Sequence, residues 1–197
     1  MQSSEITTLH VFDFDGTLVR SPQRDTIINV PGLGKATAQE IYKQWREIEK
    51  KPPQDLRGWH GCSETLKHPI FPRPLQEEML IRDVADRFLE SKNNPNVHTM
   101  LMTGRHVGLM YLVFEILKGY ELLTSDDIRL QKVETVFYKR LHNVNSTFSW
   151  KTKKIRELSE SYFNIEIWED RPDHIEGFEQ LFVELDHLDY YKVHRVG

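Results

Sequence analysis

The chain has 197 residues, of which 39% are hydrophobic and 28% charged, and its formal net charge is −4. This length suffices for one domain with a sizeable core, and the slight acidic excess argues against a broad nucleic-acid groove while leaving room for one small bound anion. The single cysteine, Cys62, excludes an internal disulfide, favours a reducing compartment and is expected to be an inert buried thiol.

Nothing along the chain predicts contact with a membrane. The first residues, MQSSEITTLH, lack the basic end and apolar stretch of a secretory signal. The longest apolar run, LMYLVF, ends at Glu115 and is too short to span a bilayer. We therefore expect a soluble intracellular protein, cytoplasmic or nuclear.

Strands and helices are predicted to alternate along most of the chain. Residues 8–14 (TLHVFDF) predict a buried strand, because β-branched and aromatic residues run up to Gly16. Further strands are predicted at residues 96–105, 133–140, 164–171 and 190–196, the last at an edge. Helices are predicted at residues 35–50, 74–92, 106–120, 146–163 (with Ser146 or Thr147 as N-cap) and 172–187.

This alternation predicts an α/β fold with a mainly parallel sheet covered by helices on both faces. The segment 21–74 differs, because it is rich in proline, glycine and polar residues and holds one predicted helix. We interpret it as a small flap or cap inserted after the first strand of a single Rossmann-like domain that spans residues 1–197.

Acidic residues follow the first predicted strand and a later one. Asp13 and Asp15 come after the first strand, and Glu169 and Asp170 after the strand at 164–171. Ligands of such sheets bind at the carboxyl ends of the strands, so these carboxylates are expected to converge around a cation. Oxygen ligands favour Mg²⁺, and no His/Cys spacing suggests zinc.

Hydroxyl and ammonium groups are predicted at the same edge. Thr103 and Gly104 end a strand just before a helix, which suits a phosphate oxygen. Lys151 lies in the first turn of its helix, where the dipole disfavours a cation, and this suggests that its ammonium is held for an anion. Lys153 and Lys154 are rivals that point to other helix faces. Together these groups are the parts needed for phosphoryl transfer.

Four motifs resemble those of the haloacid dehalogenase (HAD) superfamily of phosphohydrolases, in order and spacing: DFDGT, MLMTGR, Lys151 and WEDR. More narrowly, FDGTL, WHGCSETLKHPIFPRP, LMTGR, TFSWK and IWEDRPDH resemble the HAD domain of Swiss Army Knife RNA repair proteins. The TGR and EDR forms are also similar to the 3′-phosphatase domains of polynucleotide kinase–phosphatases. Nothing resembles a fused ligase or kinase domain.

The resemblance implies roles for the first motif and its partners. Asp13 would be the nucleophile that forms an aspartyl-phosphate. Asp15 would protonate the leaving oxygen and then activate water, and its backbone carbonyl would bind Mg²⁺. Thr103 would hold a phosphoryl oxygen, Lys151 would neutralise nucleophile and phosphate, and Thr17 would shape the substrate loop.

The fourth motif is less specific. Asp170 would bind Mg²⁺ directly with Glu169 or Asp173 in support, but the motif departs from the commoner Gly-Asp form, so the direct metal ligand stays open. Gly104 and Arg105 are predicted to bind substrate. Arg105 and Arg171 could equally pair with nearby acids.

Other motifs have plainer interpretations. GLGKAT at residues 32–37 lacks the spacing of a phosphate loop and predicts a turn into a helix, and KTKKIR at 151–156 predicts a solvated surface. Trp59, His60 and His68 could contact a nucleotide or simply pack a loop. His174 is expected to cap or pack its helix.

The leading hypothesis is a Mg²⁺-dependent phosphomonoesterase that acts on a phosphorylated substrate such as an RNA or nucleotide 3′-end. A phosphatase for a small metabolite and a catalytically inactive HAD-fold binding module are the alternatives. The sequence indicates neither a protein partner nor an oligomeric state.

Overall fold

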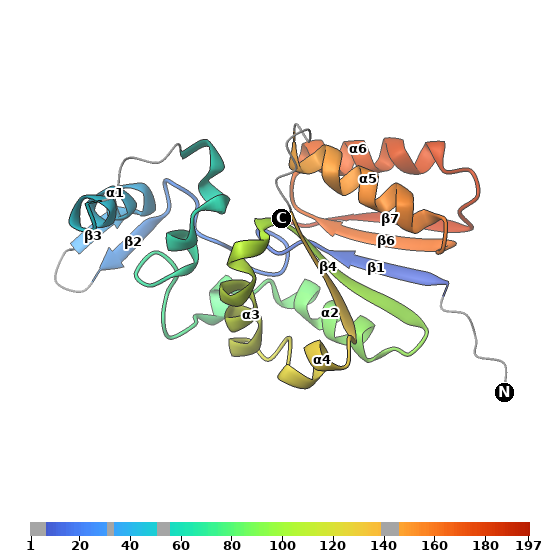
Figure 1. The fold of residues 1–197 in the computed structure, drawn as a ribbon, viewed down its shortest axis with the longest axis horizontal. Helices are drawn as coiled ribbons and strands as arrows, with labels where there is room; N and C mark the ends of the chain where they lie inside the picture. The colour runs from blue at the N-terminus through green and yellow to red at the C-terminus, as the bar shows by residue number, and fades with distance from the viewer. Residues whose placement is uncertain (1–6, 31–33, 51–55, 139–145) are drawn as a thin grey trace.

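The computed structural model describes residues 7–30, 34–50, 56–138 and 146–197 (Figure 1). A five-stranded sheet with the order β5-β4-β1-β6-β7 forms its centre. All four strand pairs are parallel, which confirms the predicted α/β class, and β7 lies at an edge as expected. The strands are β1 (Thr8–Phe12), β4 (Val97–His106), β5 (Val133–Tyr138), β6 (Asn164–Glu169) and β7 (Tyr190–Arg195).

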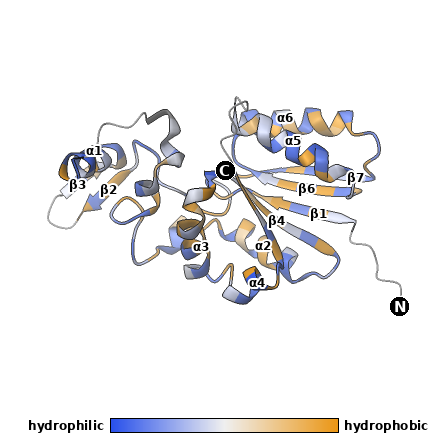
Figure 2. Ribbon diagram, viewed as in Figure 1, coloured by the Kyte–Doolittle hydropathy of each residue, from blue (hydrophilic) through white to orange (hydrophobic). Residues whose placement is uncertain are grey.

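Helices cover both faces of this sheet (Figure 1). α5 (Thr147–Ser159) and α6 (Pro172–Glu184) lie on one face. On the other face lie α2 (Arg82–Asn93), α3 (Met110–Gly119) and the short α4 (Ser125–Arg129). Parallel strands buried on both faces are expected to be apolar on both, and Figure 2 shows apolar residues along them.

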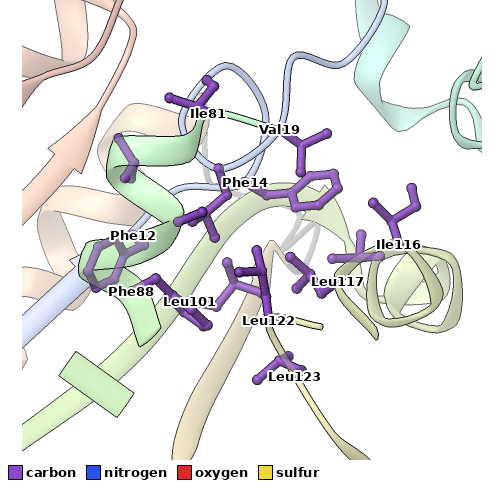
Figure 3. Close-up of a cluster of buried hydrophobic side chains, with 14 of the residues drawn as sticks. Phe12, Phe14, Val19, Ile81, Phe88, Leu101, Ile116, Leu117, Leu122 and Leu123 are labelled. Atoms are coloured by element: carbon purple, nitrogen blue, oxygen red, sulfur yellow. The ribbon is translucent and has the colours of Figure 1, made fainter. Parts of the chain in front are cut away.

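Alternate side chains of β1 enter different cores. Leu9 and Val11 belong to the cluster under α5 and α6, whereas Phe12 belongs to the larger cluster under α2 and α3. Figure 3 shows part of that larger cluster, where Phe12 and Phe88 pack edge to face at 5.2 Å between ring centroids. Because its side chains pack into both clusters, β1 is held in place between the two helical layers, and the residues that follow it are held with it.

The segment 21–74 forms a small lobe beside the end of the sheet (Figure 1). It contains an antiparallel hairpin of β2 (Ile27–Val30) and β3 (Gly34–Thr37), then α1 (Ala38–Ile48) and two 3₁₀ turns, Leu56–Gly61 and Ser63–Leu66. The lobe has its own apolar cluster of buried side chains, namely Val30, Ala38, Ile41, Tyr42, Trp59, Cys62 and Ile70. Cys62 is buried there, as expected.

α1 begins later than predicted because the residues before it pair in the hairpin. Thr37 is its N-cap and forms a capping box with Glu40, in which each side chain binds the other residue's backbone N–H. The described part of GLGKAT is therefore strand and cap; Gly32 and Leu33 lie outside the described residues.

The helix predicted at 74–92 is also shorter, since α2 starts at Arg82. Leu80 forms a β-bridge with Val19, and the backbone N–H of Ile81 donates to the carbonyl of Leu18 at 3.0 Å. These tertiary hydrogen bonds keep the preceding residues out of the helix. The hairpin and α4 were not predicted, and residues 139 and 140 of the strand predicted at 133–140 lie outside the described residues.

Candidate active site

A pocket of about 1280 Å³ opens at the carboxyl ends of β1, β4 and β6. One side is formed by residues of the sheet and of α5 and α6, including Asp13, Asp15, Lys151 and Asp170. The other side comes from the segment 21–74, with Gln23, Arg24, Asp25 and residues 58–61. The structure thus brings together the two aspartates after β1, the lysine of α5 and the acid after β6.

Asp13 lies one residue beyond β1 and is only 8% exposed. Its Oδ1 accepts a hydrogen bond from the backbone N–H of Phe14 at 2.8 Å, and Lys151 Nζ lies 2.9 Å from its Oδ2. Burial raises the pKa of Asp13 to about 6, and the nearby ammonium opposes but does not cancel that effect. This carboxylate is accessible from the pocket and held in one orientation.

Lys151 is 2% exposed and bridges two acids. Besides Asp13, its Nζ donates to Glu169 Oε2 at 2.7 Å. Burial disfavours the ammonium, but Asp13 and Glu169 outweigh it and raise the pKa of Lys151. Of the two rival lysines, Lys153 is exposed and Lys154 is half-buried, and neither lines the pocket.

Asp13, Glu169 and Asp170 form a carboxylate cluster, with one oxygen of each within 4.8 Å of the others. Burial and the charges of Asp13 and Glu169 raise the pKa of Asp170 to about 7. Its Oδ1 is buried and has no hydrogen-bond partner among the described residues. Such an arrangement is costly without a cation, so the donor set fits Mg²⁺.

Within this cluster, Asp13 and Asp170 are the better placed to ligate. Glu169 Oε2 already accepts from Lys151 and lies 3.1 Å from Nδ1 of His174. These partners outweigh burial and lower the pKa of Glu169 to about 2. The approach of Asp170 to the loop after β1 requires Gly16, where φ is +72° and a Cβ atom would lie 2.0 Å from Asp170 Oδ2.

Asp15 stands apart from the carboxylate cluster. Arg105 holds it with a bidentate contact, Nε to Oδ2 at 2.8 Å and Nη2 to Oδ1 at 2.6 Å. Despite burial, Arg105 and His60 keep the pKa of Asp15 well below its usual range. Its side chain is thus not free for a metal, and a metal contact through its backbone carbonyl stays a prediction.

Arg105, predicted to bind substrate, is fully buried and does not line the pocket. It also donates to the carbonyl of His60 at 2.8 Å and to Thr65 Oγ1 at 2.6 Å. The structure therefore supports the alternative that Arg105 pairs with an acid. Arg171 differs from Arg105, because it lines the pocket as well as pairing with Asp173 at 2.7 Å. Asp173 lies outside the carboxylate cluster.

Of the other residues predicted to contact substrate, one lines the pocket and two are buried and do not line it. Gly104 lines the pocket, and a Cβ atom there would lie 2.7 Å from the methyl group of Thr147. Thr103 is buried behind it, where its Oγ1 accepts from the backbone N–H of Arg105 at 3.1 Å. Thr17 is fully buried with no partner for its hydroxyl among the described residues. Contacts of Thr103 and Thr17 with substrate stay predictions.

His174 is the residue that sequence reasoning undervalued. It was expected only to cap or pack, yet it lines the pocket, is 1% exposed and contacts Glu169. Its ring also packs against Phe148 at 5.3 Å between centroids. The available signal was its place in the first turn of α6, directly after the WEDR motif.

The profile of a family described as HAD domain family 1 in Swiss Army Knife RNA repair proteins matches residues 57–195, more than half of the chain. The chain belongs to this family. The match starts after Asp13 and Asp15, so it does not itself include the first motif. The position of Asp13 beside Lys151, which the match does include, is what joins that motif to the domain.

One solved HAD domain shares the fold. The HAD domain of effector protein Lem4 from Legionella pneumophila superposes with a TM-score of 0.54 at 13% identity, covering 98% of this chain and 88% of that one. Effector Ceg4 of the same organism gives a TM-score of 0.49 at 11% identity, covering 99% and 89%. No curated protein matches the sequence. Among the described helices, none is long and apolar enough to cross a membrane.

Proposed function

We propose that the chain is a Mg²⁺-dependent phosphomonoesterase that works through an aspartyl-phosphate on Asp13. The observation that carries this proposal is the placement of Asp13, a buried, pocket-lining carboxylate, 2.9 Å from the Lys151 ammonium and within 4.8 Å of an oxygen of Asp170. A carboxylate nucleophile with fixed positive charge around it is suited to phosphoryl transfer. Membership of a HAD family is consistent with hydrolase chemistry.

The reaction has two steps. In the first, an oxygen of Asp13 attacks phosphorus and the bond from phosphorus to the leaving oxygen breaks. Because Arg105 keeps Asp15 ionised at rest, Asp15 relays to that oxygen the proton that the substrate monoanion brings. In the second, a water attacks the phosphoryl group on Asp13, and Asp15 takes its proton. Inorganic phosphate and free Asp13 result. Lys151 holds the charge of nucleophile and phosphate throughout.

The cofactor of this proposal would be held by Asp13 and Asp170, with Glu169 behind them. When bound, Mg²⁺ supplies positive charge to the phosphoryl oxygens. Asp13 is buried and Asp170 half-buried, and the pKa values of both acids are raised, which supports a cation beside them.

We further propose that the substrate is a phosphorylated RNA or nucleotide end. The pocket, at about 1280 Å³, exceeds the space needed for a phosphate group, and this supports a substrate with a sizeable part beyond it. The family description names RNA repair proteins. Arg24 and His60, from the segment 21–74, line the side away from the sheet.

A panel of phosphomonoesters tests this function. RNA oligonucleotides with 3′-, 5′- or 2′-phosphate, a sugar phosphate and an aryl phosphate are compared at equal concentration with Mg²⁺ and with excess chelator. We expect the 3′-phosphorylated oligonucleotide to be hydrolysed fastest and chelator to silence the reaction.

The matched variants are Asp13→Asn, expected to lose activity by at least about 10³-fold, and Asp86→Asn on the exposed face of α2 away from the pocket, expected to retain it. A sugar phosphate turned over faster than every oligonucleotide would favour the metabolite phosphatase. A wild-type chain inactive on the whole panel would favour the binding module.

A further inference from the structure

His60 is the residue of the segment 21–74 that reaches the chemistry. Three residues of this segment had two interpretations from sequence. Trp59 is buried and donates from Nε1 to the carbonyl of Pro22 at 2.9 Å, so it packs the lobe. His68 is exposed and does not line the pocket. His60 lines the pocket, and its side chain is 36% exposed there.

The contacts of His60 converge on one guanidinium. Its Nδ1 lies 3.2 Å from Nη2 of Arg105 and 3.5 Å from Oδ1 of Asp15, while its carbonyl accepts from Nη1 of Arg105. An arginine N–H group can only donate, so Nδ1 is the acceptor of this contact in the tautomer of His60 that carries its proton on Nε2. The same Nη2 donates to Asp15 Oδ1 at 2.6 Å.

We propose that His60 is a positioning residue for Asp15, and that it acts by fixing the Arg105 guanidinium. The proposal rests on the proposed function, in which Asp15 handles the proton of the leaving oxygen and of the attacking water. Arg105 Nη2 has two hydrogens, one for Asp15 and one for His60, so the contact with His60 adds a second restraint on the nitrogen that donates to Asp15.

Thr65 Oγ1 supports the same arrangement from the other side, since it accepts from Arg105 Nη1 at 2.6 Å. The segment 21–74 therefore has two roles in this proposal. It lines the pocket, and through His60 and Thr65 it holds the arginine that binds Asp15. A small displacement of a proton-transferring group lowers the rate of reaction strongly. His60 can therefore affect kcat through the position of Asp15, although it does not transfer the proton itself.

The test compares His60→Ala, His60→Gln and His60→Asn with the wild type. Asparagine places its Oδ1 close to the position of Nδ1 and keeps the acceptor, whereas alanine and glutamine do not. Lys43→Ala, on the exposed face of α1 in the same lobe, is the control. Thermal unfolding with Mg²⁺ verifies that each variant is folded. If the alanine variant does not fold, the glutamine variant replaces it, because glutamine fills more of the volume of the histidine side chain.

Each variant is assayed on p-nitrophenyl phosphate and on phenyl phosphate. Phenolate is the poorer leaving group and depends more on a well-placed acid. For alanine and glutamine we expect kcat on phenyl phosphate to fall about tenfold or more and kcat on p-nitrophenyl phosphate to fall less, with KM little changed. Asparagine is expected to restore both.

A second readout follows the covalent step. With p-nitrophenyl phosphate, slower hydrolysis of the aspartyl-phosphate in the alanine and glutamine variants should give a burst of p-nitrophenol before a slow steady state. A merely destabilised site would lower both phases together.

Four outcomes overturn the inference. They are wild-type rates in both the alanine and the glutamine variant, equal losses on both substrates, no burst in the impaired variants, or an asparagine variant as slow as alanine, which would point to the other ring nitrogen. A wild-type chain inactive on both substrates with Mg²⁺ would instead overturn the proposed function, and this inference with it.

Discussion

At the scale of single residues, Glu169 links the buried charged groups of the site. Its Oε2 meets Lys151 Nζ at 2.7 Å and His174 Nδ1 at 3.1 Å, and Lys151 in turn meets Asp13. A buried chain of this kind stays ordered only while every member has its partner. Sequence predicted the lysine and the acids because strand ends and motif spacing locate them, but it could not predict which oxygen meets which nitrogen.

The role of Lys151 can be tested by comparing it with Lys153, which lies on the same helix. Lys151→Met removes the positive charge next to Asp13, and we expect kcat to fall by about 10²-fold or more. Lys153→Met, two residues along the same helix but exposed, is expected to keep wild-type activity. Steady-state assays on an aryl phosphate decide the matter, and equal losses in both variants would remove the role assigned to Lys151.

Arg105 shows the same limit of sequence reasoning. The residue next to Thr103 and Gly104 could bind phosphate or pair with an acid, and only the fold decides, since Asp15 is separated from it by most of the first half of the chain. Long-range pairing of this kind leaves no periodic pattern in the sequence.

At the scale of elements, the strands of the sheet were predicted well because β-branched and aromatic residues recur along each of these short segments. The hairpin of β2 and β3 was missed since Ile27 and Lys35 are exposed and its residues show no clean alternation. The helix predicted at 74–92 began too early, because the spacing of Leu75, Met79, Val84 and Phe88 fits one helical face. The backbones of Leu80 and Ile81 pair with the chain after β1 instead.

The short α4 offers a pH test of an element. Asp127 caps it together with Thr124 and pairs with Lys92 at 2.9 Å. Burial opposes the charged form, yet Lys92 and Thr124 lower the pKa of Asp127 to about 2 from its ordinary value of 3.8. The folded pKa lies below the unfolded one, so the stabilisation is complete above about pH 4 and is lost as the pH falls toward 2.

Asp127→Asn should therefore lower the free energy of unfolding at neutral pH by about 2 kcal/mol, and the difference from wild type should shrink below pH 4. Urea unfolding at several pH values measures this. Asp126→Asn, at an exposed neighbour paired with Arg129, is the control and should change stability by less than about 0.5 kcal/mol. A pH-independent difference for Asp127→Asn would contradict the assignment.

At the scale of the whole molecule, the pocket exists because two parts of the chain meet. The sheet supplies Asp13, Lys151 and Asp170, and the lobe formed by the segment 21–74 supplies the facing wall. Arg105 joins them, since one buried guanidinium contacts Asp15 on one side and Thr65 on the other. The sequence predicted an insertion at this place, but not that it would be tied to the acid behind the pocket.

The central claim is that Asp13 takes the phosphoryl group. Borohydride reduces an acyl phosphate to an alcohol, so a reaction quenched during turnover and then reduced should convert the phosphorylated aspartate to homoserine. We predict that peptide mass spectrometry of the wild-type chain, quenched with Mg²⁺ and substrate present, will find this conversion at Asp13 and at no other acid. Hydrolysis that proceeds with Asp13 unmodified, or with the change at another residue, would contradict the account.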